Sequence, residues 1–306
     1  MKPDATPFPS EDAWTAHLAA SLAQRDDVRT GIGDDAAVVQ SPGVAYDLVY
    51  TTDAVVESIH FFPGTAPRKI GRKIVGRLLS DLAAMGAEPD HILLNLVCPK
   101  TTPALVLKEI YAGAEALAVQ FGARVIGGDT LSSSPLALHG FASGRLPAGS
   151  AVLRSGAQPG DAVYVTGKLG GSLAGRHLDF IPRVTEGIWL RSGGWPTAMM
   201  DVSDGLARDL RRIADRSGVG VRIIAENLPC HDGIDIHHAL TDGEDYELVF
   251  TVNEPKTSAF ESAWSAATAL PCTRIGVITP AATGLVLVES DGHTRPFETA
   301  GYDHLV

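Results

Sequence analysis

Seven aspartates are expected in short turns rich in Gly, Ser or Thr, and most of them directly follow an apolar run. They are Asp34, Asp35, Asp53, Asp81, Asp129, Asp201 and Asp204. Ionised carboxylates that are crowded together repel one another, and their pKa values rise unless a cation lies between them. Carboxylate and hydroxyl oxygens are the ligands that Mg²⁺ takes from proteins, together with waters and substrate phosphates. The pattern therefore predicts a fold that gathers these side chains around magnesium and a polyphosphate.

Strands and helices are expected to alternate along the first half of the chain. Pro67 suits the first turn of a long helix, 67–85, because proline fixes φ and lacks an N–H. A second helix is expected over 103–121, with Gly122 as its C-terminal cap. The other expected elements are a helix that begins at Ser10 and strands over 36–39, 44–51, 91–98, 124–126 and 136–143. This alternation predicts an α/β unit.

A second α/β unit is expected after the first, which divides the chain into domains 1–146 and 147–306. A chain of 306 residues is long enough for two such domains. The elements expected in the second unit are strands over 162–166, 220–224, 246–252, 274–279 and 284–289, and helices over 205–217 and 255–267.

Composition restricts the partners and the compartment. The net charge of −11 argues against general binding to nucleic acid or to anionic membranes. No apolar stretch approaches the roughly 18 residues of a membrane span, and the N-terminus lacks the pattern of a signal peptide. The cysteines Cys98, Cys230 and Cys272 lack metal-site spacing, so we interpret them as small buried apolar residues. A cytoplasmic location is expected.

Two glycine-rich stretches have to be weighed as nucleotide sites. Residues 31–36, GIGDDA, match the glycine spacing of dinucleotide-binding folds, but they lack a preceding strand and a following helix. Residues 167–172, GKLGGS, could form a nest of backbone N–H groups that binds an anion, or only a tight turn after a strand. The chain contains no GxxxxGK[ST], so a Walker-type site is excluded.

The acidic motifs also have ordinary structural interpretations. In DVSDG, residues 201–205, one acid could cap the helix that follows, but a second acid favours metal ligation. Asp81 lies within an apolar helix, where a buried carboxylate is costly unless it is paired or metal-bound. GEDYEL, residues 243–248, could be no more than a charged turn, and His237–His238 suit a solvated helix end. The sequence has no GxSxG or HExxH motif, so triad hydrolases and zincins lack support.

Taken together, these strings resemble the thiamine-monophosphate kinase family, within the superfamily of aminoimidazole ribonucleotide synthetase. The matching strings are GIGDDAAV, TTDAVVESIHF, SDLAAMGAEP, GGDT, LRSGAQPGD, DVSDGL, GEDYEL and GYDH, in this order over residues 31–306. The resemblance implies an α/β (α+β) fold of two domains. The mixed sheet of the N-terminal domain would contribute to a barrel in a homodimer, and the C-terminal α/β domain would complete the active-site cleft.

The resemblance also implies a reaction, in which ATP and several Mg²⁺ ions phosphorylate thiamine monophosphate to thiamine diphosphate. Because the acceptor is already an ionised phosphate, direct in-line transfer without a phosphoenzyme is expected. Two alternatives are a related ATP-dependent enzyme with a different acceptor and a non-catalytic nucleotide-binding dimer. The acidic positions favour an enzyme, and GEDYEL favours the thiamine branch.

Roles for individual residues follow from the same resemblance. The implied magnesium ligands are Asp35, Thr51, Thr52, Asp53, Asp81, Asp129, Asp201 and Asp204. The implied ATP contacts are Tyr111, Gly128, Asp129, Arg154 and Ser203, and Asp204 and Arg154 are the implied catalytic residues. His60, Glu244 and Tyr302 would contact thiamine monophosphate, with Tyr302 as an aromatic surface for its ring.

Overall fold

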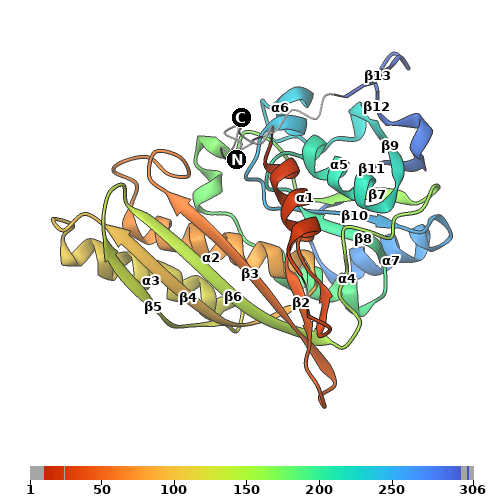
Figure 1. Cartoon of the computed structure of the whole chain (residues 1–306). Helices are drawn as coiled ribbons and strands as arrows, with labels where there is room; N and C mark the ends of the chain where they lie inside the picture. The colour runs from red at the N-terminus through yellow and green to blue at the C-terminus, as the bar shows by residue number, and fades with distance from the viewer. Residues whose placement is uncertain (1–9, 24, 298–301, 303–306) are drawn as a thin grey trace, which may run out of the picture.

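The structure, a computed structural model, describes residues 10–23, 25–297 and 302. Its N-terminal half forms a six-stranded sheet in the order β1-β2-β3-β6-β4-β5, with only β4 and β5 parallel (Figure 1). The strands are β1 (Val28–Thr30), β2 (Ala37–Gln40), β3 (Tyr46–Val56), β4 (Glu88–Cys98), β5 (Arg124–Ser132) and β6 (Ala137–Pro147). Helices α2 (Pro67–Ala84) and α3 (Ala104–Gln120) cover one face of this sheet. The other face is not covered by any described element of the chain.

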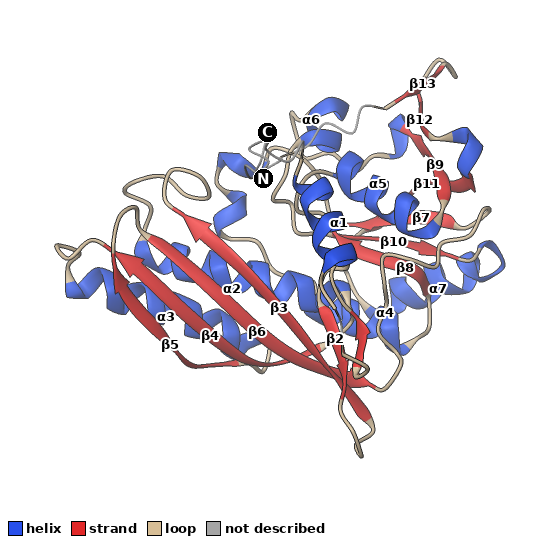
Figure 2. Cartoon of the chain, in the orientation of Figure 1, coloured by secondary structure: helices blue, strands red, loops and turns tan. Residues whose placement is uncertain are grey.

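The C-terminal half forms a seven-stranded sheet in the order β13-β12-β9-β11-β7-β10-β8, in which β9 and β12 are parallel. The strands are β7 (Ala162–Thr166), β8 (Pro196–Asp201), β9 (Val219–Ile224), β10 (Leu248–Val252), β11 (Cys272–Pro280), β12 (Leu285–Val288) and β13 (Thr294–Pro296). Helices α5 (Leu206–Ser217) and α6 (Ile236–Thr241) pack on one face, and α4 (Val184–Ser192) and α7 (Thr257–Ala267) pack on the other (Figure 2). The predicted two-domain α/β fold with mixed sheets is confirmed.

Helix α2 lies at the junction of the two domains. It contacts β3 and β6 of the first sheet and α4 and β8 of the second domain. Ile74, Leu78 and Leu82 are fully buried in one hydrophobic cluster that continues into the second sheet through Met199 and Phe250. The predicted division at residues 146 and 147 therefore stays a prediction, because no break in the core marks it.

Most predicted elements lie where the sequence placed them, but several strands are longer than predicted, and two of these extensions affect the site. The strand expected over 44–51 extends to Val56, and the strand expected over 124–126 extends to Ser132. Asp53 and Asp129 therefore lie within strands, and the expectation that they stand in turns was wrong. Neither α4 nor β8 was among the predicted elements, because both segments are short and follow neither the helical nor the strand period over enough residues.

The capping predictions were correct. The Ser10 side chain accepts a hydrogen bond from the Ala13 N–H at the start of α1 (Glu11–Ser21), the helix that lies between the two domains in Figure 1. Pro67 is the first residue of α2, and Gly122 follows α3 with a φ of 79°.

All three cysteines are free thiols, of which Cys98 is buried and the other two are half-buried. Among the described helices, none is long and apolar enough to span a membrane.

Two glycines set the close approach of α2 and α3. A Cβ atom on Gly113 would lie 2.0 Å from the Arg68 carbonyl oxygen, and one on Gly71 would lie 1.8 Å from the Ile110 carbonyl oxygen. These neighbours are backbone atoms, so a side chain at either position forces the helices apart. The position of α2 between the two domains therefore depends on these two residues.

We predict that Gly113→Ala lowers the free energy of unfolding by roughly 2 kcal/mol, because the backbone overlap outweighs the gain in helix propensity of about 1 kcal/mol. The control is Leu105→Ala on the same helix, where the side chain is 69% exposed, and a change within about 0.5 kcal/mol is expected. Urea denaturation followed by circular dichroism measures both. Equal stability of Gly113→Ala and the wild type would contradict the close-packing argument.

Candidate active site

An acidic cavity of about 430 Å³ opens where α2, β3 and the turn before α5 meet. Five of the predicted metal ligands line it, and they come from both domains: Thr52, Asp53, Asp81, Asp201 and Asp204. Arg154 and Ser203, which were also predicted site residues, line the same cavity. The fold therefore brings together side chains that are up to 152 positions apart in the sequence (Thr52 to Asp204).

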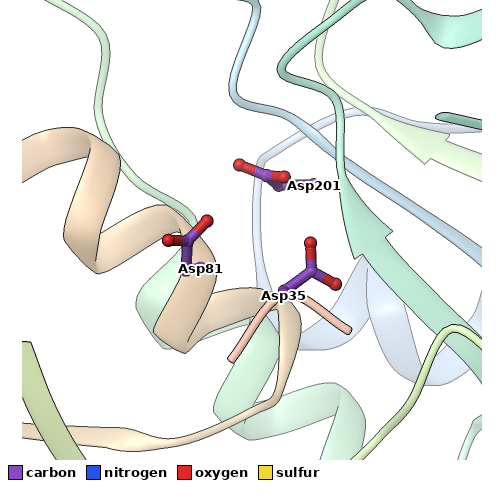
Figure 3. A group of neighbouring side chains, drawn as sticks. All are labelled: Asp35, Asp81 and Asp201. Carbon is purple, nitrogen blue, oxygen red and sulfur yellow. The ribbon is translucent and has the colours of Figure 1, made fainter. Parts of the chain in front are cut away.

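Three carboxylates converge most closely, and Figure 3 shows them pointing toward one another. One oxygen each from Asp35, Asp81 and Asp201 lies within 4.8 Å of the other two. Asp35 comes from the turn before β2, Asp81 from α2, and Asp201 from the end of β8. Burial, and next the charge of Asp35, raise the pKa of Asp201 to about 7. Burial and the charge of Asp201 hold the pKa of Asp81 well above its usual range.

The carboxylates around the cavity differ in their partners. Arginine nitrogens lie close to three of them: Arg154 at 2.7 Å from Asp35, Arg77 at 2.5 Å from Asp53, and Arg212 at 2.7 Å from Asp204. Asp81 and Asp201 instead accept hydrogen bonds of 2.6 Å from the hydroxyls of Thr51 and Ser80. Neither of these two forms an ion pair within the described residues.

This donor set fits a hard divalent cation. The buried Asp201 and the half-buried Asp81 have elevated pKa values and only hydroxyl partners, and a cation between them would favour their ionised forms. Oxygen ligands at this spacing suit Mg²⁺, whose octahedral shell places ligand oxygens about 3 to 4 Å apart. Asp35, Asp81 and Asp201 are the residues that could hold it, and Thr51 and Ser80 orient two of the three carboxylates.

The DVSDG segment does not cap α5 with its own acids. The N-cap residue is Gly205, which offers no side-chain cap, and the buried carboxylate of Asp209 accepts the N–H groups of Ser203 and Asp204 at 3.0 and 3.1 Å. Asp209, a residue of α5 itself, thus fixes the turn that precedes the helix. The capping interpretation of Asp201 and Asp204 was wrong, and both side chains point toward the cavity that they line.

A second cavity of about 290 Å³ adjoins the acidic one. The predicted substrate residues His60, Glu244 and Tyr302 all line it. Burial and then the charge of Arg77 lower the pKa of His60 to about 4, so its imidazole is neutral at pH 7. Tyr302 is half exposed, and its backbone N–H donates to the Asp204 carbonyl at 3.2 Å. Three residues line both cavities and form their common wall: Arg77, Ser203 and Asp204.

Glu244 is held by a buried cationic group. Its Oε2 atom lies 2.5 Å from Lys73 Nζ and 2.9 Å from His177 Nδ1. Burial raises the pKa of Glu244, but the His177 hydrogen bond and the Lys73 charge outweigh it and lower that pKa to about 2. GEDYEL is therefore more than a charged turn, because Asp245 and Glu247 are buried and the half-buried Glu244 is anchored by Lys73 and His177.

The GKLGGS stretch is a tight turn rather than an open anion nest. The N–H of Gly170 donates to Asp245 at 2.8 Å, and the N–H of Gly171 donates to Asp242 at 2.7 Å. These carboxylates occupy the donors that an external phosphate would need. His237 and His238 lie exposed on α6, as predicted.

The predicted ATP contacts on the first domain lie apart from the acidic cavity. Tyr111 on α3 donates to the Leu94 carbonyl at 3.2 Å, and Gly128 lies against the same carbonyl. Asp129 is exposed on the edge strand β5, and its backbone is separated from Asp53 by β4 and β6, about 14 Å at the usual strand spacing. The expectation that Asp129 converges with the other acids was therefore wrong for a single chain.

Thr52 also differs from the expectation that its side chain is a magnesium ligand. Its hydroxyl donates to the Gly140 carbonyl at 2.8 Å across the β3–β6 pair, and it lies at the rim of the acidic cavity. Thr51, on the helix-facing side of the same strand, is the threonine that contacts a carboxylate, Asp81. Neighbouring residues of a strand point to opposite faces, so only one of the two can face the buried acids.

Several site residues were missed from the sequence: Lys73, Arg77, His177, Asp209 and Arg212. One signal could have identified two of them. Lys73, Arg77 and Asp81 stand four residues apart in α2, which places all three on one side of the helix. A charged row on a largely buried helix needs partners, and here these include Glu244 of the second domain and Asp53 of the first.

Comparison with known proteins agrees with this geometry. Residues 33–146 match the family of the AIR synthase related protein, N-terminal domain, and residues 182–288 match the corresponding C-terminal domain. The chain is 38% identical to the thiamine-monophosphate kinase of Salmonella typhimurium, and the match covers 92% of this chain and 93% of that protein.

Two solved structures are similar over nearly the whole chain. The crystal structure of thiamine-monophosphate kinase from Stenotrophomonas maltophilia is 36% identical, with a TM-score of 0.74 over 91% of this chain and 95% of that chain. The structure described as AaThiL complexed with AMPPCP and TMP is 28% identical, with a TM-score of 0.80 over 96% of this chain and 97% of that chain.

We predict that this chain binds Mg²⁺ more tightly at pH 8 than at pH 6. In the metal-free protein the pKa of Asp201 rises from 3.8 to about 7, so a bound proton competes with the cation below pH 7. The same shift means that folding favours the protonated acid, and the contribution of this site to stability falls as pH rises from about 4 to 7.

Isothermal titration calorimetry at the two pH values measures this effect, and a gain of up to about tenfold in affinity per pH unit below the pKa is expected. Asp201→Asn should weaken the pH dependence, because an amide does not titrate in this range and the loss of its charge also removes one cause of the raised pKa of Asp81. Equal Mg²⁺ affinity at pH 6 and pH 8 in the wild type would contradict the assignment of Asp201 as a ligand.

Proposed function

The chain belongs to the thiamine-monophosphate kinase family of AIR synthase related proteins, and from this membership we propose that it transfers the γ-phosphoryl group of ATP to thiamine monophosphate. The products are thiamine diphosphate and ADP. The observation that carries the proposal is the adjacency of two chemically different cavities. One is acidic, the other is lined by His60, Glu244 and Tyr302, and they share a wall that contains Ser203 and Asp204.

We propose different roles for the residues that line the two cavities. We propose that Asp35, Asp81 and Asp201 hold Mg²⁺, which when bound neutralises the triphosphate and the charge that develops during transfer. Arg154, held by both oxygens of Asp35 at 3.2 and 2.7 Å, is placed to contact phosphate oxygens. The roles of Thr51, Thr52, Asp53, Ser203 and Asp204 as ligands or contacts stay predictions.

On the acceptor side, no strong base is needed because the phosphate of thiamine monophosphate is already ionised. His60 is neutral at pH 7, and its Nδ1 accepts the Val56 N–H at 3.1 Å, which leaves its other ring nitrogen as a hydrogen-bond donor. Tyr302 supplies an aromatic face at the mouth of the cavity. These features favour direct in-line transfer without a phosphoenzyme.

We also propose that two copies of the chain pack through the uncovered face of the first sheet. Large apolar side chains on its strands are exposed, among them Leu93, Leu131 and Phe141, and β5 is an unpaired edge. Such a surface is typical of an interface between subunits. We propose that Tyr111, Gly128 and Asp129, which lie beside this edge, complete the ATP site of the partner and form part of the barrel implied for the family.

A reducing cytoplasm is the location that we propose for the protein. All three cysteines are free thiols. Proteins of oxidising compartments pair such residues as disulfides far more often.

The direct test of the function is turnover of the purified protein with ATP, Mg²⁺ and thiamine monophosphate. We predict equal amounts of ADP and thiamine diphosphate, and a loss of at least about 10³-fold in kcat for Asp204→Asn, because the lost carboxylate lies on the wall between the cavities. Chromatography of the thiamine products measures both.

The matched control for that variant is Asp215→Asn at the end of α5, whose side chain is largely exposed and paired only with Arg211 among the described residues. Its kcat should stay within about twofold of the wild type. Turnover on a different acceptor but not on thiamine monophosphate would favour a related superfamily enzyme. ATP binding without turnover on any acceptor would favour a non-catalytic dimer.

The proposed dimer makes a separate prediction for two inactive variants. Asp129→Asn and Asp204→Asn, mixed under conditions that exchange subunits, should regain up to about a quarter of wild-type activity. Half of the dimers are then mixed, and one of their two sites receives both native acids. No activity above that of either variant alone would show that Asp129 and Asp204 serve the site of the same chain.

A further inference from the structure

The side chain of Lys73 on α2 is completely buried, with 0% of its surface exposed. Lysine is almost never buried to this extent unless its ammonium is paired, because a charge is costly to remove from water. Apolar residues of similar size often replace a buried ion pair without loss of stability. The stability of the core therefore does not explain why a lysine stands at this position.

The ammonium of Lys73 joins three segments that are far apart in the sequence. Its Nζ atom donates to the His60 carbonyl at 2.6 Å and to Glu244 Oε2 at 2.5 Å, and it lies 2.6 Å from His177 Nδ1. An ammonium has three N–H donors, so three neighbours are as many as it can bind. Two of these neighbours, His60 and Glu244, line the second cavity, and the acidic cavity is lined by other residues.

Both segments that Lys73 contacts at this cavity have backbones that need support. Glu244 and Tyr246 have φ values of 66° and 53°, in a region that residues with a side chain seldom adopt. Ser58, two residues before His60, has a φ of 68°. Such conformations persist only where the surrounding structure holds them. Lys73 supplies one of these contacts to each segment, from a helix that packs against both domains.

We propose that Lys73 is a positioning residue of the acceptor site, which fixes Glu244 against the turn that carries His60. Because its ammonium is buried, it acts through these two residues and not on the acceptor directly. Loss of the ammonium leaves Glu244 with Arg77 as the fixed charge on its other oxygen, so the carboxylate shifts in the cavity wall. The inference rests on the proposed kinase reaction for the identity of the acceptor, but not for the effect on the two segments.

The first experiment compares hydrogen exchange in unliganded Lys73→Met and in the wild type by mass spectrometry. The amides of His60 and Glu244 both form backbone hydrogen bonds, so their exchange reports on the two segments. Exchange in peptides that cover 57–62 and 243–247 should become at least about tenfold faster, because the contact that fixes both is lost. Exchange in α7, which lies on the outer face of the second sheet, should stay the same.

The second experiment is steady-state kinetics of the same two proteins. The KM for thiamine monophosphate should rise at least about tenfold in Lys73→Met, while the KM for ATP stays within about twofold. A lysine that only stabilised the core would change the amount of active enzyme, and with it kcat, without separating the two KM values.

Two further variants keep the test decisive. Lys69→Met, one turn earlier on α2, removes an exposed ion pair of 2.6 Å with Asp179 and should change neither experiment. Lys73→Met combined with Glu244→Gln removes both charges of the buried pair, so neither is left unpaired during folding. Since Lys73 serves to fix Glu244, the KM for thiamine monophosphate in this double variant should lie within about twofold of that in Glu244→Gln alone.

Unchanged exchange in either segment of folded Lys73→Met would overturn the proposal, as would equal increases in the two KM values. A double variant in which the two single effects multiply would also overturn it, because Lys73 would then act independently of Glu244. The exchange experiment requires no turnover, so it still tests the role of Lys73 if the wild type proves inactive on thiamine monophosphate. That inactivity would instead contradict the proposed reaction.

Discussion

The structure depends on two carboxylates, the half-buried Asp81 and the buried Asp201, that face each other across the junction of the domains. Their oxygens lie within 4.8 Å of each other and of Asp35, and their hydrogen-bond partners are the hydroxyls of Thr51 and Ser80. An ionised pair in this position costs several kcal/mol unless a cation compensates it. The packing of α2 between the two sheets fixes Asp81 opposite Asp201, so the hydrophobic core and the charged site are built by the same helix.

The outer acids Asp35, Asp53, Asp204 and Glu244 differ from the central pair, Asp81 and Asp201, because each of them has a cationic partner. Arg154, Arg77 and Arg212 neutralise Asp35, Asp53 and Asp204, and Lys73 does the same for Glu244. The cationic side chains of this negatively charged chain thus pair with the outer acids, and Asp81 and Asp201 form no ion pair among the described residues. This distribution of charge explains how a protein of net charge −11 can bind a polyphosphate: divalent ions bind at the central pair, and fixed arginines surround it.

Much of this could be predicted from the sequence, and the reasons for the failures are physical. Pro67 indicated the start of α2, and the order of the motifs indicated both the family and the acids Asp81, Asp201 and Asp204. The partners of those acids could not be predicted, because Arg77, Asp209 and Arg212 carry no local pattern that reveals which carboxylate they will meet. Asp129 was placed wrongly because the strand continues through GGDT, which turns its side chain to the uncovered face of the sheet. Tertiary pairing, rather than local propensity, decided each of these cases.

The central claim is that Asp35, Asp81 and Asp201 hold a divalent cation beside the triphosphate. Anomalous diffraction from crystals grown with Mn²⁺ and a non-hydrolysable ATP analogue tests it most directly. The account predicts a Mn²⁺ peak within about 2.5 Å of an oxygen from each of the three acids. A nucleotide bound in the cavity with Mn²⁺ peaks elsewhere, and none at these three carboxylates, would contradict it.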